Sequence, residues 1–337
     1  VRDFDIVTLD RLKRIEIEPD YETWKEYAYK KGVHASVMTY LAARKKDFYK
    51  IENAADGKHF VTARGWDDLS EMIKLYEENG LAVDEQLICQ YLQDARISKD
   101  FAIYYDLFNK YRSDYQVEKI LDGTVSESIV LRAERASMDE RLSLLGLIFD
   151  SVTAQLRTVC ERENILDLVT GQLKTLKEKL KDVSGAAALL SKMIEAEREK
   201  LERGKQSSSI SPQTQRETRF MLEYLEEFRA AVMRSGTAQK DEFSVVRESF
   251  VQKVAELKGL AADGGRALEN VFSFCEKAFA DGDEILIFVT ELTANYYSAR
   301  FIGRYGCDRY YMHNKQLQFD QRQQEIIKRM DEIQWTV

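Results

Sequence analysis

The chain of 337 residues contains only 2 prolines, where average usage would give about 17. It has no apolar run near the ~18 to 20 residues that span a bilayer. Its formal charge is −8 with no long Lys/Arg block, which argues against a dedicated nucleic-acid-binding protein. The four cysteines form no C-x-x-C pair, and the N-terminus lacks the pattern of a secretory signal. We therefore expect a cytoplasmic protein with reduced thiols that binds neither nucleic acid nor a membrane.

The sequence also lacks the short motifs of common enzyme chemistries. A phosphate-binding loop requires G-x-x-x-x-G-K-[ST], and the nearest segments, 57–59 and 204–206, have neither the upstream glycine nor the hydroxyl. No histidine follows a glutamate by three positions, as a di-iron bundle requires. Cys307 and His313 are spaced so that they fall on different faces of a helix. We expect no metal site, and this stretch alone is not expected to be catalytic.

What the sequence does contain is helical periodicity. With few prolines and 32% charged residues, the composition favours long helices. The alternation of apolar and charged residues over 4–18 is the one strand signal, so we expect an all-α fold with at most that strand. Three regions follow: a module of five short helices over 1–121, a long-helix segment with coiled-coil character over 122–206, and an antiparallel helical bundle over 207–337.

Helix boundaries are predicted from residues that cap backbone groups or break helices. The predicted starts are Asp20, Thr62, Asp84, Ser98 and Ser137. Glycines at 259, 264 and 265 predict a break between helices over 240–258 and 266–280, and two further helices are predicted over 283–304 and 308–333. Trp24 and Trp66 lie on apolar helix stripes and are predicted to be core residues.

Two arginines stand out in the first module. Arg11 comes just before the strand residues Arg14 to Pro19, and Arg64 falls in the first turn of the helix that Thr62 begins. A cation in the first turn of a helix interacts unfavourably with the positive end of the helix dipole, and the negative charge of a bound phosphate would offset this interaction. The alternative is a surface arginine that pairs with Asp67 or Asp68.

The same segments, taken in order, resemble a known family. They are Leu9-Asp10-Arg11-Leu12, the strand Arg14 to Pro19, the helix containing Trp24, Gly32-Val33-His34, and Phe60-Val61-Thr62-Ala63-Arg64-Gly65-Trp66. Their order and spacing resemble the last core strand and helical lid of a MoxR-type AAA+ ATPase over about residues 5–100. The family usually has proline where Ala63 stands and often where Ala35 stands, and these differences should loosen two turns without removing the arginines.

The resemblance implies roles for both arginines. Arg11 would be the arginine finger that reaches the γ-phosphate bound by a neighbouring subunit, and Arg64 the sensor 2 residue that contacts the nucleotide of its own subunit. The phosphate loop, the Mg²⁺-binding segment and sensor 1 would lie upstream of Val1, so we expect the C-terminal part of a longer ATPase. The intact protein would use ATP and Mg²⁺, form a hexameric ring and remodel protein complexes, alongside a partner with a von Willebrand A domain; this fragment would bind no cofactor.

Two other functions remain open from the residues alone. The chain could be a helical scaffold or adaptor whose arginines are ordinary surface residues, or an enzyme acting within the bundle. A reading frame that extends about 200 residues upstream and contains a phosphate loop would favour the ATPase. A natural start within a few residues of Val1 would favour the scaffold.

Overall fold

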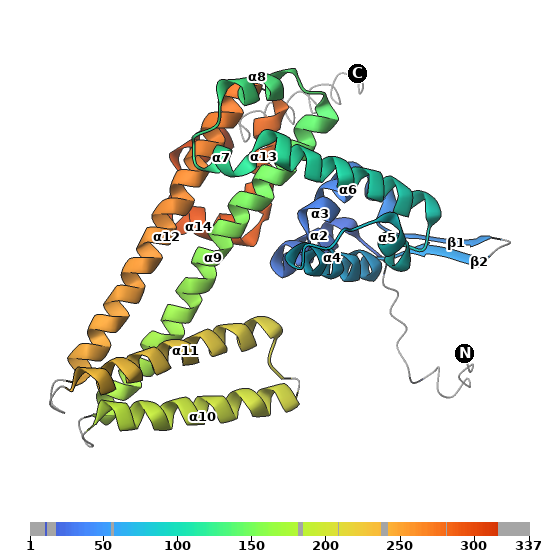
Figure 1. Ribbon diagram of the computed structural model, residues 1–337. Coiled ribbons are helices and arrows are strands. Elements are labelled where there is room, and N and C mark those ends of the chain that lie inside the picture. The colour runs from blue at the N-terminus through green and yellow to red at the C-terminus, as the bar shows by residue number, and fades with distance from the viewer. Residues whose placement is uncertain are drawn as a thin grey trace, which may run out of the picture. The chain divides into compact units, whose positions relative to one another are not determined.

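The computed structural model describes residues 11, 18–54, 57–180, 185–207, 209–236, 242–280 and 282–315. These residues are mostly helical, with one two-stranded antiparallel sheet, so the all-α prediction is confirmed (Figure 1). Most of the strand predicted over 4–18 lies outside the described residues, although Arg11 is helical. The chain divides into two compact units, Val1–Asp114 with Leu142–Leu147, and Tyr115–Arg141 with Ile148–Val337.

The first unit consists of short helices around one hairpin. Its elements are α2 (Tyr21–Lys31), α3 (Ala35–Ala43), the 3₁₀ turn η1 (Lys45–Asp47), β1 (Lys50–Ala54), β2 (Gly57–Val61), α4 (Ala63–Glu78), α5 (Glu85–Tyr91) and α6 (Ala95–Tyr115). Gly32 ends α2 in the left-handed conformation with φ 77°, a region that glycine adopts without steric cost. Its N–H donates to the carbonyl of Ala28 at 2.8 Å, as in a standard helix C-cap.

The β1–β2 hairpin was not predicted, because residues 53–57 indicated only a loop. The strands pair from Lys50 opposite Val61 to Ala54 opposite Gly57. Phe60 of β2 also pairs with a residue beyond the hairpin, because its N–H donates to the Gln93 carbonyl at 3.0 Å. Pairing between strands and with residue 93 is non-local, so the composition of the turn alone could not reveal it.

Four of the five predicted helix starts are confirmed. The side chains of Asp20, Thr62, Asp84 and Ser137 each accept a hydrogen bond from the backbone N–H three residues later. The fifth, Ser98, was wrong. Asp94 begins α6 instead, since its Oδ1 accepts from the backbone N–H groups of Arg96 and Ile97. The Ser98 hydroxyl donates to the Asp94 carbonyl, which leaves it inside the first turn.

Asp94 makes the stability of the first unit depend on pH. Burial alone would raise the pKa of this carboxyl, but the Lys50 ammonium at 2.8 Å and the N–H groups of Ile97 and Arg96 outweigh burial and hold the pKa below its usual 3.8. A lowered pKa contributes stability that is present above the unfolded-state pKa and is lost as pH falls through the folded-state value.

We therefore expect Asp94→Asn to flatten the loss of stability on acidification below about pH 5. Melting temperatures of the wild type and the variant, measured in steps from pH 7 to 2, test this. Glu52→Gln is the matched control, because Glu52 also contacts Lys50 but keeps 61% of its side chain exposed. An unchanged pH slope in Asp94→Asn would show that the Asp94 carboxylate does not stabilise the unit in this way.

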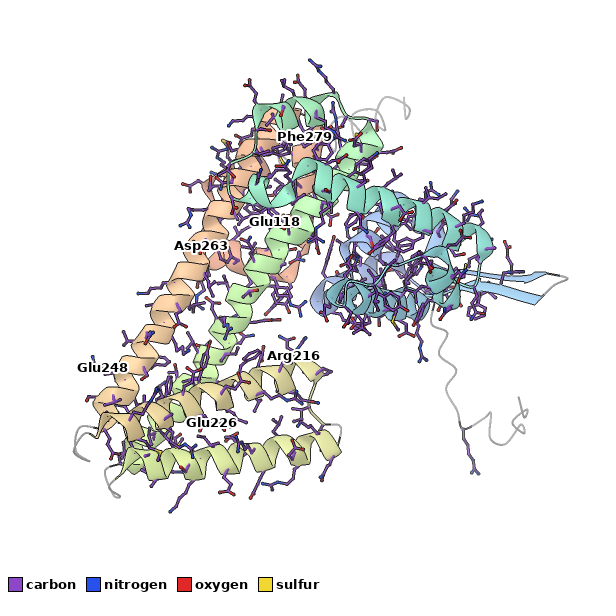
Figure 2. The ribbon with its side chains drawn as sticks, in the orientation of Figure 1. Glu118, Arg216, Glu226, Glu248, Asp263 and Phe279 are labelled. Atoms are coloured by element: carbon purple, nitrogen blue, oxygen red, sulfur yellow. The ribbon has the colours of Figure 1, made fainter. Side chains whose placement is uncertain are left out.

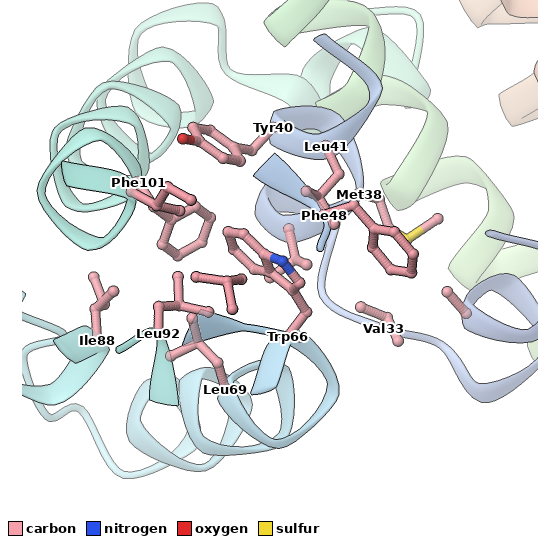
Figure 3. Close-up of a cluster of buried hydrophobic side chains, with 14 of the residues drawn as sticks. Val33, Met38, Tyr40, Leu41, Phe48, Trp66, Leu69, Ile88, Leu92 and Phe101 are labelled. Atoms are coloured by element: carbon pink, nitrogen blue, oxygen red, sulfur yellow. The ribbon is translucent and has the colours of Figure 1, made fainter. Parts of the chain in front are cut away.

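The core of the first unit packs aromatic side chains among aliphatic ones (Figure 3). Trp66 is 0% exposed, and its ring lies 5.6 Å from that of Tyr40 and 5.3 Å from that of Phe101. Trp24 is 9% exposed and packs against Phe48, with ring centroids 5.1 Å apart. Both tryptophans are therefore core residues, as their helical spacing predicted.

The second unit is built on long helices. Its elements are α7 (Val117–Leu121), α8 (Glu127–Arg135), α9 (Met138–Lys179), α10 (Ala186–Gln206), α11 (Pro212–Ser235), α12 (Glu242–Phe279), α13 (Asp283–Ala294) and α14 (Tyr296–Tyr305). The α10–α11 hairpin lies at one end of α9 and α12, and the shorter helices α7, α8 and α13 pack near the other end of α12 (Figure 1). Pro212 occupies the first turn of α11, where its missing N–H has no cost.

The predicted break at the three glycines was wrong, because α12 runs without interruption from Glu242 to Phe279. Close packing explains why one of the three positions, residue 264, is glycine. A Cβ on Gly264 would lie 3.1 Å from Leu156 Cδ2 and 3.5 Å from the Phe301 ring. Glycine at this position lets α12 lie close to both neighbours, so it reflects a close approach rather than a helix end.

The helix predicted over 283–304 is instead two helices joined at Asn295. The buried Asn295 side chain accepts hydrogen bonds from the N–H groups of Tyr297 and Ser298 and so begins α14. The chain is helical again over 308–315, and the rest of the helix predicted to 333 lies outside the described residues. Among the aromatic residues of this region, Tyr297, Phe301 and Tyr310 are buried, whereas Tyr296, Tyr305 and Tyr311 are exposed.

One helix of the described residues, α9, is long and apolar enough to cross a membrane by length and composition. In the protein, 56% of its most apolar window is buried. Core helices of soluble proteins pass the same test, and α9 contributes Val152, Leu156 and Val169 to the interior of the second unit. The burial of α9 is consistent with a soluble protein.

Candidate functional site

The candidate site lies at the start of α4, where each residue of the segment 62–66 has a separate structural task. Thr62 caps the helix by accepting the Gly65 N–H at 3.2 Å. Gly65 lies against the end of α5, because a Cβ there would be 2.7 Å from the Tyr91 carbonyl oxygen. Trp66 is fully buried, and its indole N–H donates to the Asp47 carbonyl at 3.3 Å. The backbone of Arg64 is therefore fixed on one side by Thr62 and on the other by Gly65 and Trp66.

Arg64 points into solvent from this fixed backbone. Its side chain is 89% exposed, and its Nε lies 3.4 Å from Asp68 Oδ2 one turn later. Exposed pairs with this spacing contribute about 0.3 to 0.5 kcal/mol, so the contact holds the guanidinium only weakly. Of the two alternative partners considered for Arg64, Asp68 is the one the structure pairs with it.

Asp67 is engaged elsewhere. Its Oδ2 accepts from Lys31 Nζ at 2.6 Å and from the Tyr27 hydroxyl at 3.3 Å, while its buried Oδ1 has no hydrogen-bond partner among the described residues. Burial alone would lower the pKa of Lys31, but Asp67 outweighs it and raises that pKa. This contact could not be predicted from the sequence, because 36 residues separate Lys31 from Asp67.

The start of α4 therefore carries balanced charge. Lys31 and Arg64 are cations, and Asp67 and Asp68 are carboxylates of the same surface. Tight binding of an anion at Arg64 would require further donors beyond these four groups, because the carboxylates offset the attraction of the cations. Arg11 is exposed, and the residues on either side of it, 1–10 and 12–17, lie outside the described ranges. No contact between described residues joins Arg11 to Arg64.

Among the described residues, no group of three or more His, Cys, Asp or Glu residues could hold a metal ion. His313 contacts Glu276 at 3.1 Å, and the Cys307 thiol donates to Glu269 at 3.5 Å. Burial raises the pKa of Cys160 and of Cys307 to about 11. These thiols are protonated at neutral pH and are poor nucleophiles.

In the described part of the second unit, grooves lie on either side of α11. One, of about 580 Å³, lies between α10 and α11 and is lined by charged residues that include Glu195, Arg198, Glu226 and Arg229. Figure 2 labels Glu226 on α11. Arg198 pairs with Glu226 across this groove. The other groove, of about 260 Å³, lies among α9, α11 and α12, and its lining mixes apolar and aromatic residues with charged ones.

Comparisons with known proteins add no relative, since no family model, curated protein or solved structure matches this chain. Functional assignment therefore depends on the residue pattern of about 5–100 and on the geometry of the first unit.

Proposed function

We propose that this chain is the lid and helical extension of a MoxR-type AAA+ ATPase that uses ATP hydrolysis to remodel or mature protein complexes. The observation that carries the proposal is the position of Arg64. It is an almost fully exposed arginine in the first turn of a helix whose backbone is fixed on both sides, by the Thr62 cap and by buried Trp66.

The electrostatics of α4 support this function. The N-terminus of a helix favours anions by about 0.3 to 1 kcal/mol, so an exposed arginine there weakens the helix unless it serves a ligand. Its weak contact with Asp68 can be exchanged for a phosphate at little cost, because both groups are largely in solvent. Arg64 would then contact the nucleotide of its own subunit as a sensor 2 residue.

Arg11 has a different role in the proposal. Phosphoryl transfer depends on positioning and on stabilising charge, and an arginine supplied by a neighbour accelerates it by about 10³ to 10⁵ in other nucleotide hydrolases. Arg11 would supply this charge to the adjacent subunit of a hexameric ring. ATP and Mg²⁺ would be held by upstream segments of the intact cytoplasmic protein, and a von Willebrand A domain protein is the proposed partner.

ATP turnover by the intact protein tests both roles. We expect Arg11→Ala to lower kcat by about 10³ or more and Arg64→Ala to lower it as well, with a weaker effect for Arg64→Lys, which keeps the charge. Arg112→Ala is the matched control, because Arg112 is another exposed arginine of a first-unit helix. Equal rates in the wild type and in both alanine variants would remove both assignments.

The Arg64–Asp68 pair favours a second candidate, a helical scaffold or adaptor without a nucleotide role. In that function Arg64 is an ordinary surface residue of α4. The same turnover experiment separates the two, and so does the reading frame, because a scaffold would have no phosphate loop upstream.

A further inference from the structure

We draw no further inference here: the strongest candidate, the surface patch of α14 in which exposed Tyr296 lies beside Arg300 and Arg304, carries no proposal, because both arginines are already paired with the buried Glu163 and nothing in the described part of the structure shows what covers the patch.

Discussion

Trp66→Ala is expected to destabilise the first unit by about 3 to 5 kcal/mol, the range measured for truncating large buried aromatic residues. Trp66 is 0% exposed and contacts the rings of Tyr40 and Phe101, so alanine would leave a cavity in the centre of the aromatic core. The change would also leave the carbonyl of buried Asp47 without the indole N–H that it accepts. Most domains are stable by only 5 to 15 kcal/mol, so this loss is a large fraction of the total.

Hydrogen exchange measured by mass spectrometry locates the effect. Amides of α4 and α6 should exchange faster in Trp66→Ala, while those of α12 in the second unit provide an internal reference. Trp66→Phe keeps most of the ring contacts and should cost less. Leu75→Ala is the control on the same helix, since Leu75 is 51% exposed and surface changes of this kind usually stay within about 0.5 kcal/mol. Wild-type exchange in α4 of Trp66→Ala would show that Trp66 does not support this core.

Features set by neighbours in sequence could be predicted. The caps at Asp20, Thr62 and Ser137 each act on a backbone N–H three residues away, so the sequence alone contains both partners. The burial of Trp24 and Trp66 followed from helical periodicity for the same reason.

Features set by distant contacts could not be predicted. Gly264 resembles a helix breaker until its approach to Leu156, more than 100 residues away in the chain, is known. The helix that carries Arg64 was predicted correctly because Thr62 marks its start. Asp68, one turn away, was among its predicted partners, whereas the engagement of Asp67 with Lys31 required the tertiary structure.

A further strong effect is expected at Gly146 of α9, which lies against Thr39 of α3 within the first unit. A Cβ at residue 146 would overlap Thr39 Cγ2. Thr39 has little freedom to move aside, because its hydroxyl donates to the Ala35 carbonyl at 2.8 Å and accepts from the Tyr104 hydroxyl at 2.7 Å. Burial raises the pKa of Tyr104, which keeps that hydroxyl protonated as the donor.

Gly146→Ala has two opposing consequences. Alanine in a helix interior is favoured over glycine by up to about 1 kcal/mol, whereas overpacking a fixed contact costs about 1 to 3 kcal/mol. The overlap should dominate, so we expect a net loss of about 1 to 2 kcal/mol in the free energy of unfolding. Gly171→Ala on the same helix is the control; nothing lies within 4 Å of its added Cβ, so it should stabilise the protein slightly.

Thr39→Ser isolates the cause, because it removes only the Cγ2 methyl and keeps the hydroxyl that binds Ala35 and Tyr104. In that background Gly146→Ala no longer meets the methyl, and the helical preference of alanine should make the change neutral or stabilising. The four proteins form a double-mutant cycle, and urea unfolding should give an interaction energy of about 1 to 3 kcal/mol. If Gly146→Ala costs the same with serine as with threonine at residue 39, the close approach of α9 to Thr39 is not what requires glycine at this position.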